Sequence, residues 1–124
     1  MVLWFTNENP AYLHAEFQLA TAKSDLEKLK YELRKSEEEL ARAESNVESI
    51  DTTLSYLRKY AEAVSLREYR TIRDQRIYNW ASVIHLRKQI PITAKSIKIV
   101  EAEIARLQGE IPALQCKVLE FKRD

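Results

Sequence analysis

The chain has 124 residues, of which 45% are hydrophobic and 31% charged, and its formal net charge is +1. This length and hydrophobic content predict one folded domain, and the near-zero charge argues against a global attraction to nucleic acid or membranes. One cysteine excludes an intrachain disulfide, and no apolar run reaches membrane length, so we expect a cytoplasmic protein that does not enter a membrane.

The composition favours long helices over strands. A single glycine and three prolines leave little from which to build tight turns, whereas strong helix formers such as leucine, alanine, glutamate, lysine and arginine are abundant. We therefore predict an all-α fold in one domain spanning 1–124. Residues 1–9 are expected to be a short apolar N-terminal segment, with Asn9 as the N-cap and Pro10 at the first position of the first helix.

The first helix is predicted over residues 10–64, because apolar residues recur there at alternating steps of three and four. This spacing over more than six heptads is typical of a coiled coil, and only one member is polar. We call these positions the first seam: Tyr12, Ala15, Leu19, Ala22, Leu26, Leu29, Leu33, Ser36, Leu40, Ala43, Val47, Ile50, Leu54, Leu57, Ala61 and Val64.

A turn is predicted at residues 65–68. The step from Val64 to the next apolar position, Tyr69, is five residues, so the spacing loses phase at this place. The sequence SLRE is a capping box, in which Ser65 accepts a hydrogen bond from the backbone N–H of Glu68 and starts a new helix without a glycine.

The second helix is predicted over residues 69–122, with a second alternation of three and four. Pro91 and Pro112 each remove a backbone hydrogen bond, and we expect them to kink this helix without breaking it. The second seam comprises Tyr69, Ile72, Arg76, Asn79, Val83, Leu86, Ile90, Thr93, Ile97, Val100, Ile104, Leu107, Ile111, Leu114, Val118 and Phe121.

Together these elements predict a long antiparallel coiled-coil hairpin, with opposed residue numbers summing to about 133. Small residues of the first seam then face branched ones of the second, as Ala43 faces Ile90, which close packing requires. One alternative is a three-helix bundle with helix starts at 51–53 and 93. Another is a single continuous helix forming an extended dimer.

Apolar residues outside the seams indicate a further interface. Tyr56 and Tyr60 form a short line on the first helix, and Ile77, Trp80 and Ile84 form one on the second. An exposed patch of this kind indicates association. We expect a second copy to cover it, giving a dimer or a four-helix bundle, and the alternative is an unidentified protein partner.

The charges are unevenly distributed. Nine acidic and five basic residues lie between Asp25 and Asp51, whereas eight basic and three acidic residues lie between Arg58 and Lys88. Candidate partner-binding or phosphate-binding residues are Arg58, Lys59, Arg67, Arg70, Arg73 and Arg76.

Most of these arginines have no acidic neighbour in the sequence. Arg70 has Asp74 four residues on, but Arg67, Arg73 and Arg76 lack an acid at helical spacing, and Arg76 is expected opposite Leu57 and Asn79 opposite Leu54. Four interpretations remain open. The arginines are solvated and stacked on aromatic rings (Arg76 on Trp80, Arg73 on Tyr69), or they meet the acidic segment of a second copy, an acidic partner protein, or the phosphates of a nucleic acid.

Signs of catalysis are missing from the sequence. His14 and His85 lie far apart, and there is no metal-ligand spacing and no glycine-rich phosphate loop. We expect neither an enzyme nor a cofactor, a metal or a small-molecule ligand. The hypothesis is a non-catalytic protein-binding coiled-coil module that acts as an adaptor, a scaffold or a small inhibitor of a larger protein machine. The alternative is a nucleic-acid-backbone binding protein that uses the arginines of residues 67–76.

Overall fold

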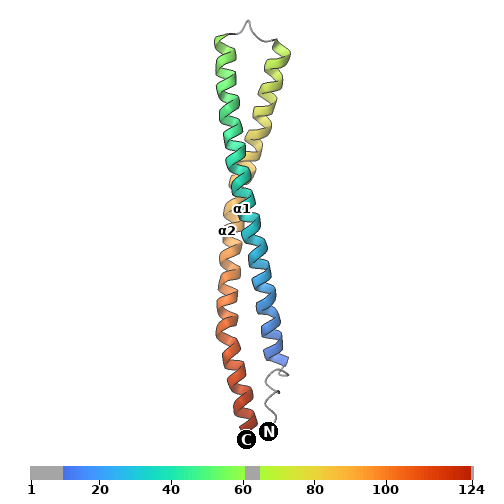
Figure 1. Cartoon of the computed structure of the whole chain (residues 1–124), viewed down its shortest axis with the longest axis vertical. Helices are drawn as coiled ribbons and strands as arrows, with labels where there is room; N and C mark the ends of the chain where they lie inside the picture. Colours follow the sequence, from blue (N-terminus) through green and yellow to red (C-terminus); the bar gives the residue numbers. More distant parts are fainter. Residues whose placement is uncertain (1–9, 61–64, 124) are drawn as a thin grey trace. The chain divides into compact units, whose positions relative to one another are not determined.

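The computed structural model of the chain describes residues 10–60 and 65–123, with side chains described up to Leu114. It consists of two helices, α1 (Pro10–Lys59) and α2 (Leu66–Arg123), which pack against each other as a hairpin (Figure 1). No strand occurs in this part of the chain, so the predictions of an all-α fold and of a helical hairpin are confirmed. The predicted N-terminal segment 1–9 lies outside the described residues.

The chain divides into two compact units, each built from a stretch of both helices. One unit combines residues 1–31 with 94–124, and the other comprises residues 32–93.

In residues 32–93, every described seam position is buried or half-buried, because steps of three and four keep these side chains on one face of each helix. Val83 is completely buried. The seam positions of this unit are Leu33, Ser36, Leu40, Ala43, Val47, Ile50, Leu54 and Leu57 on α1, and Tyr69, Ile72, Arg76, Asn79, Val83, Leu86, Ile90 and Thr93 on α2.

The other unit follows the same rule. Leu107 is 1% exposed there, and Ala15, Ala22, Ile97 and Ile111 are also buried. The half-buried seam positions of this unit are Tyr12, Leu19, Leu26, Leu29, Val100, Ile104 and Leu114.

The predicted pairing between the helices is wrong in residues 32–93. Val83 was expected opposite Ile50, but it packs on Ala43 and Val47, with Leu40 beside them. Within this unit, α2 is thus paired with an earlier part of α1 than the prediction gave, by about one helical turn.

The ends of the helices explain this shift. α1 ends at Lys59, whereas its predicted end is residue 64, and α2 begins at Leu66, whereas its predicted start is residue 69. The reversal is therefore centred earlier in the sequence than the predicted turn at 65–68. Ala61 and Val64, the last members of the first seam, lie outside the described residues.

Ser65 caps α2 as the capping-box pattern predicts. Its Oγ accepts a hydrogen bond of 3.2 Å from the backbone N–H of Glu68, and its carbonyl oxygen accepts one of 3.1 Å from the N–H of Tyr69. Because the first N–H groups of a helix have no partner within it, this contact replaces one that solvent would otherwise have to supply. Glu68 also places a negative charge in the first turn of α2, where the helix dipole favours it.

Replacing Ser65 by alanine is expected to lower the free energy of unfolding by about 1 kcal/mol, because the N–H of Glu68 loses its acceptor. Ser65→Asp keeps an acceptor at the cap and is the matched control, with an expected change of a few tenths of a kcal/mol. Urea denaturation followed by circular dichroism measures both. Equal losses in the two variants would contradict a capping role for this side chain.

The three-helix alternative is wrong, because α1 continues through 51–53 and α2 continues through 93. The hydroxyls of Thr52 and Thr53 donate hydrogen bonds of 3.1 Å to the carbonyls of Glu48 and Ser49, four residues earlier, so they bond within the helix and do not cap a new one. α2 also runs through Pro91 and Pro112 without a break.

Candidate partner-binding surface

The apolar line predicted on α2 is exposed. Ile77, Trp80 and Ile84 are 59%, 38% and 41% exposed. The guanidinium groups of Arg76 and Arg87 lie 5.8 and 5.5 Å from the centre of the Trp80 ring, within the range of cation–π attraction. The predicted stacking of Arg76 on Trp80 is thus confirmed, and a second cation, Arg87, lies over the same ring.

The two predicted tyrosines of α1 stack on each other. Tyr56 and Tyr60 are 57% and 49% exposed, and their ring centres lie 4.8 Å apart at an angle of 42°. The ammonium group of Lys59 lies 5.8 Å from the centre of the Tyr60 ring. These side chains form a small aromatic surface at the C-terminal end of α1.

Arg76 has a carboxylate partner, contrary to the sequence-based expectation. Its Nε donates to Oδ1 of Asp51, and its Nη2 donates to Oδ2 of the same carboxylate at 3.4 Å. The hydrogen bond to Asp51 raises the pKa of Arg76 above its ordinary value. Because α2 is paired with an earlier part of α1, Arg76 lies beside Asp51 and not at its predicted position opposite Leu57.

Arg73 also has an acidic neighbour. Its Nη2 lies 3.6 Å from Oδ1 of Asp74, so the predicted pair of Asp74 with Arg70 gives way to a pair with Arg73. The predicted stacking of Arg73 on Tyr69 is not formed. Both charged groups of the Arg73–Asp74 pair are more than half exposed, and a pair of this kind contributes little to stability.

Three predicted binding residues remain without a partner in the part of the chain that the structure describes: Arg58, Arg67 and Arg70 make no ion pair or hydrogen bond there. Arg106 shows the contrast, because its guanidinium group is bonded to both Glu103 and Glu110. The N-terminal half of α2 and the end of α1 therefore carry cationic groups that are available to a ligand or a partner.

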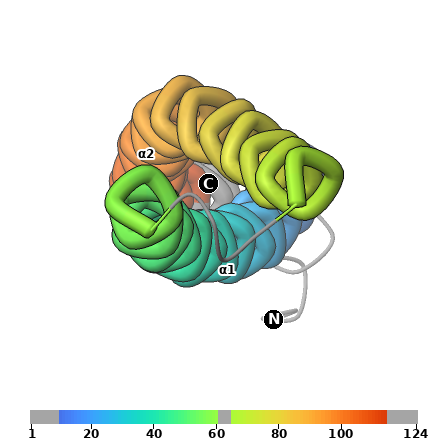
Figure 2. The backbone as a smooth tube through the Cα atoms, turned by 90° about the horizontal axis from the view of Figure 1, so that it is seen from above, coloured from blue at the N-terminus to red at the C-terminus, as the bar shows by residue number. Residues whose placement is uncertain are grey.

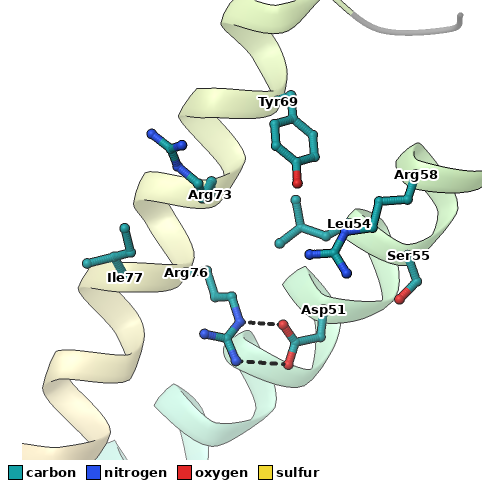
Figure 3. Close-up of a pocket in the computed structure, with 8 residues that line it drawn as sticks. All are labelled: Asp51, Leu54, Ser55, Arg58, Tyr69, Arg73, Arg76 and Ile77. Carbon is teal, nitrogen blue, oxygen red and sulfur yellow. Dashed lines mark hydrogen bonds and ion pairs between the residues drawn. The ribbon is translucent and has the colours of Figure 1, made fainter. Parts of the chain in front are cut away.

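A hollow of about 420 Å³ lies between the two helices in residues 32–93 (Figure 3). Figures 1 and 2 both show the end of α1 and the start of α2 apart from one another. Arg58 and Tyr69 point toward the space between the helices, whereas Arg73 and Ile77 point away from α1 in this view. The lining residues are Asp51, Leu54, Ser55, Arg58, Tyr69, Arg73, Arg76 and Ile77.

A second, more acidic groove of about 480 Å³ adjoins Trp80. Its α1 side carries three carboxylates, and Arg87 on α2 makes an ion pair of 3.6 Å with Glu44. The lining residues are Glu44, Val47, Glu48, Asp51, Thr52, Ser55, Trp80 and Arg87. Near Trp80, the α1 surface therefore carries carboxylates, whereas the α2 surface carries arginines.

Sequence reasoning missed the residues that join the helices next to the seam. Asp51 and Glu44 each follow a first-seam residue, and Arg87 follows a second-seam residue, so these positions flank the interface. Charged residues at flanking positions commonly pair between helices, and this signal was present in the sequence. A polar contact also crosses the seam itself: Asn46 Nδ2 donates to Asn79 Oδ1 at 3.3 Å.

Comparison with protein-family models, curated proteins and solved structures found no match for this chain. In the described helices, no segment is both long and apolar enough to cross a membrane. Residues 10–60 and 65–114 also contain no group of three or more histidine, cysteine or acidic side chains arranged to hold a metal ion.

Proposed function

We propose that the chain is a non-catalytic protein-binding helical hairpin whose first partner is a second copy of itself. The observation that carries the proposal is the exposed line of Ile77, Trp80 and Ile84, which α1 leaves uncovered. A tryptophan flanked by aliphatic side chains and arginines has the composition of the energetic centre of a protein interface. A module of this kind serves as an adaptor, a scaffold or a small inhibitor of a larger protein machine.

The order of side chains in this line suits pairing with itself. In an antiparallel arrangement about a two-fold axis beside Trp80, Ile77 of one copy falls opposite Ile84 of the other, and the two tryptophans lie next to the axis. A two-fold interface brings the same patch together twice, so the sequence Ile–Trp–Ile matches itself when reversed.

The charges support the same arrangement. Arg70 and Arg73 of one copy would extend toward Lys88 of the second, which lies beyond Ile84. Within each hairpin, Val83 packs on Ala43 and Val47, so the part of α1 that lies across from Lys88 is Glu37–Glu39. The three carboxylates of the second copy would thus lie near two cations of the first, Arg70 and Arg73. None of these three carboxylates has an ion-pair partner among the described residues.

Sedimentation equilibrium tests the proposal. The chain is expected to sediment at twice its mass of 14.5 kDa. Trp80→Ala is expected to raise the dissociation constant by about a thousandfold, because a central interface tryptophan contributes about 2 kcal/mol and each dimer carries the substitution twice. Tyr78→Ala is the matched control, since Tyr78 is 74% exposed on the same helix but outside the line.

A charge exchange tests the register of the dimer. Arg70→Glu with Arg73→Glu should weaken the dimer, the triple change Glu37→Lys, Glu38→Lys and Glu39→Lys should do likewise, and combining both sets should restore it. A monomer at tens of micromolar would contradict self-association and leave another protein as the partner of the line. Failure of the combined variant to recover would contradict the antiparallel arrangement.

Nucleic-acid-backbone binding through residues 67–76 stays the alternative. Arg67 and Arg70 favour it, because they have no partner in the described residues, whereas Arg73 and Arg76 each have an acidic neighbour. Retention of single-stranded RNA at low salt, lost steeply as salt rises, would support this alternative.

A further inference from the structure

The hollow between the end of α1 and the start of α2 brings together polar groups that have no partner in the described residues. Arg58 comes from the last turn of α1, and Tyr69 from the beginning of α2, and Figure 3 shows both side chains pointing toward the same space. Tyr69 is half-buried, and its hydroxyl makes no hydrogen bond within the described part of the chain. A donor without an acceptor, on a half-buried side chain, is a position at which a ligand oxygen gains a hydrogen bond.

The charge of the hollow is positive. Three guanidinium groups and one carboxylate line it. Arg76 uses Nε and Nη2 for Asp51, so its third nitrogen, Nη1, has no hydrogen bond there. Arg73 is directed outward to Asp74, which leaves Arg58 and the Nη1 group of Arg76 as the cationic donors nearest to the space.

From this geometry we infer that the hollow binds a phosphate group. A guanidinium group matches the oxygens of a phosphate, and donors that approach from two helices suit a tetrahedral anion better than a planar carboxylate. The volume of about 420 Å³ is that of a small-ligand pocket, and Leu54 supplies an apolar wall for the group that carries the phosphate. This site shares Ile77 with the exposed line of Ile77, Trp80 and Ile84, but it requires no second copy. It also departs from the sequence-based expectation of no small-molecule ligand.

Titration calorimetry with inorganic phosphate at constant ionic strength tests the inference on the full chain. Arg58→Ala is expected to weaken binding at least tenfold, because it removes the charge-assisted hydrogen bonds. Tyr69→Phe, which removes only the hydroxyl, is expected to weaken it about threefold. Asp51→Asn is expected to tighten binding, because it removes the one negative charge that lines the hollow.

Arg42→Ala is the matched control, because Arg42 is exposed on α1 in the same unit but does not line the hollow. Its phosphate affinity is expected to stay within twofold of the parent value, with the circular dichroism of all variants unchanged. A loss in Arg42→Ala equal to that in Arg58→Ala would overturn the site and indicate attraction to diffuse charge. No heat change up to about 10 mM phosphate, where even a weak site with a millimolar dissociation constant is filled, would also overturn it.

Three further titrations identify the source of the phosphate. Adenosine 5′-monophosphate carries a terminal phosphate, adenosine carries none, and a single-stranded oligoribonucleotide with free hydroxyl ends carries only internal ones. Binding of the monophosphate alone, lost in Arg58→Ala, assigns a small phosphorylated molecule. Tighter binding of the oligoribonucleotide, with the same loss in Arg58→Ala, assigns a nucleic-acid backbone to the same hollow. Adenosine binding as tightly as its monophosphate would overturn the phosphate inference. Because these titrations measure phosphate affinity and not oligomer mass, they fail or succeed independently of self-association.

Discussion

Val83→Asp is expected to lower the free energy of unfolding by more than about 3 kcal/mol, because it places an unpaired carboxylate in the least exposed position of residues 32–93. Val83 packs on Ala43 and Val47, which have no polar atoms in their side chains to accept or donate a hydrogen bond. A small domain is stable by only about 5–15 kcal/mol, so this one substitution removes a large part of the total. Thermal melting followed by circular dichroism measures the change.

The matched control is Tyr78→Asp, which puts the same carboxylate on the same helix at a position that is 74% exposed. Its expected effect is within about 0.5 kcal/mol of the parent, as for most surface substitutions. Similar melting curves for the two variants would show that Val83 does not lie in a packed interior.

Leu107→Ala is expected to lower the free energy of unfolding by about 2–5 kcal/mol, through the loss of apolar contact and the cavity that remains. Leu107 is 1% exposed and belongs to the unit formed by residues 1–31 and 94–124, so it tests that unit as Val83 tests the other. We expect a value near the lower limit, because two helices can move together more easily than the walls of a larger core. Urea denaturation gives the measurement.

Ile99→Ala controls for the loss of an aliphatic side chain on the same helix, since Ile99 is 62% exposed. Alanine has a higher helix propensity than isoleucine, so this variant is expected to match the parent or exceed it by a few tenths of a kcal/mol. A loss in Ile99→Ala as large as that in Leu107→Ala would contradict the assignment of the seam face.

The face that each helix buries could be predicted from the sequence, whereas the alignment of one helix against the other could not. Steps of three and four identify a face because side chains so spaced lie above one another, and all described seam positions are accordingly buried or half-buried. The same pattern looks alike after a shift of one heptad. The alignment therefore depends on where the chain reverses, and the capping box at Ser65 located only the start of α2.

The same contrast between helix face and helix alignment decided which parts of the candidate site could be predicted from the sequence. The exposed line of Ile77, Trp80 and Ile84 was predicted because it depends only on the face of α2. The partner of Arg76 was not, because finding Asp51 requires the correct alignment of the two helices. The hollow lined by Arg58 and Tyr69 was also out of reach, since it arises from the three-dimensional separation of the helix ends.

The interface between the helices is repetitive, and among the described residues it contains one hydrogen bond between two side-chain amides, that of Asn46 with Asn79. Aliphatic side chains tolerate sliding, because one leucine replaces another as a neighbour with little change in energy. Displacement of α2 by one heptad would instead place the amide of Asn46 against Ile72 or Leu86, whose side chains offer no donor or acceptor. Within residues 32–93, the amide pair thus favours one longitudinal alignment of two helices whose apolar contacts would allow several, at some cost in stability.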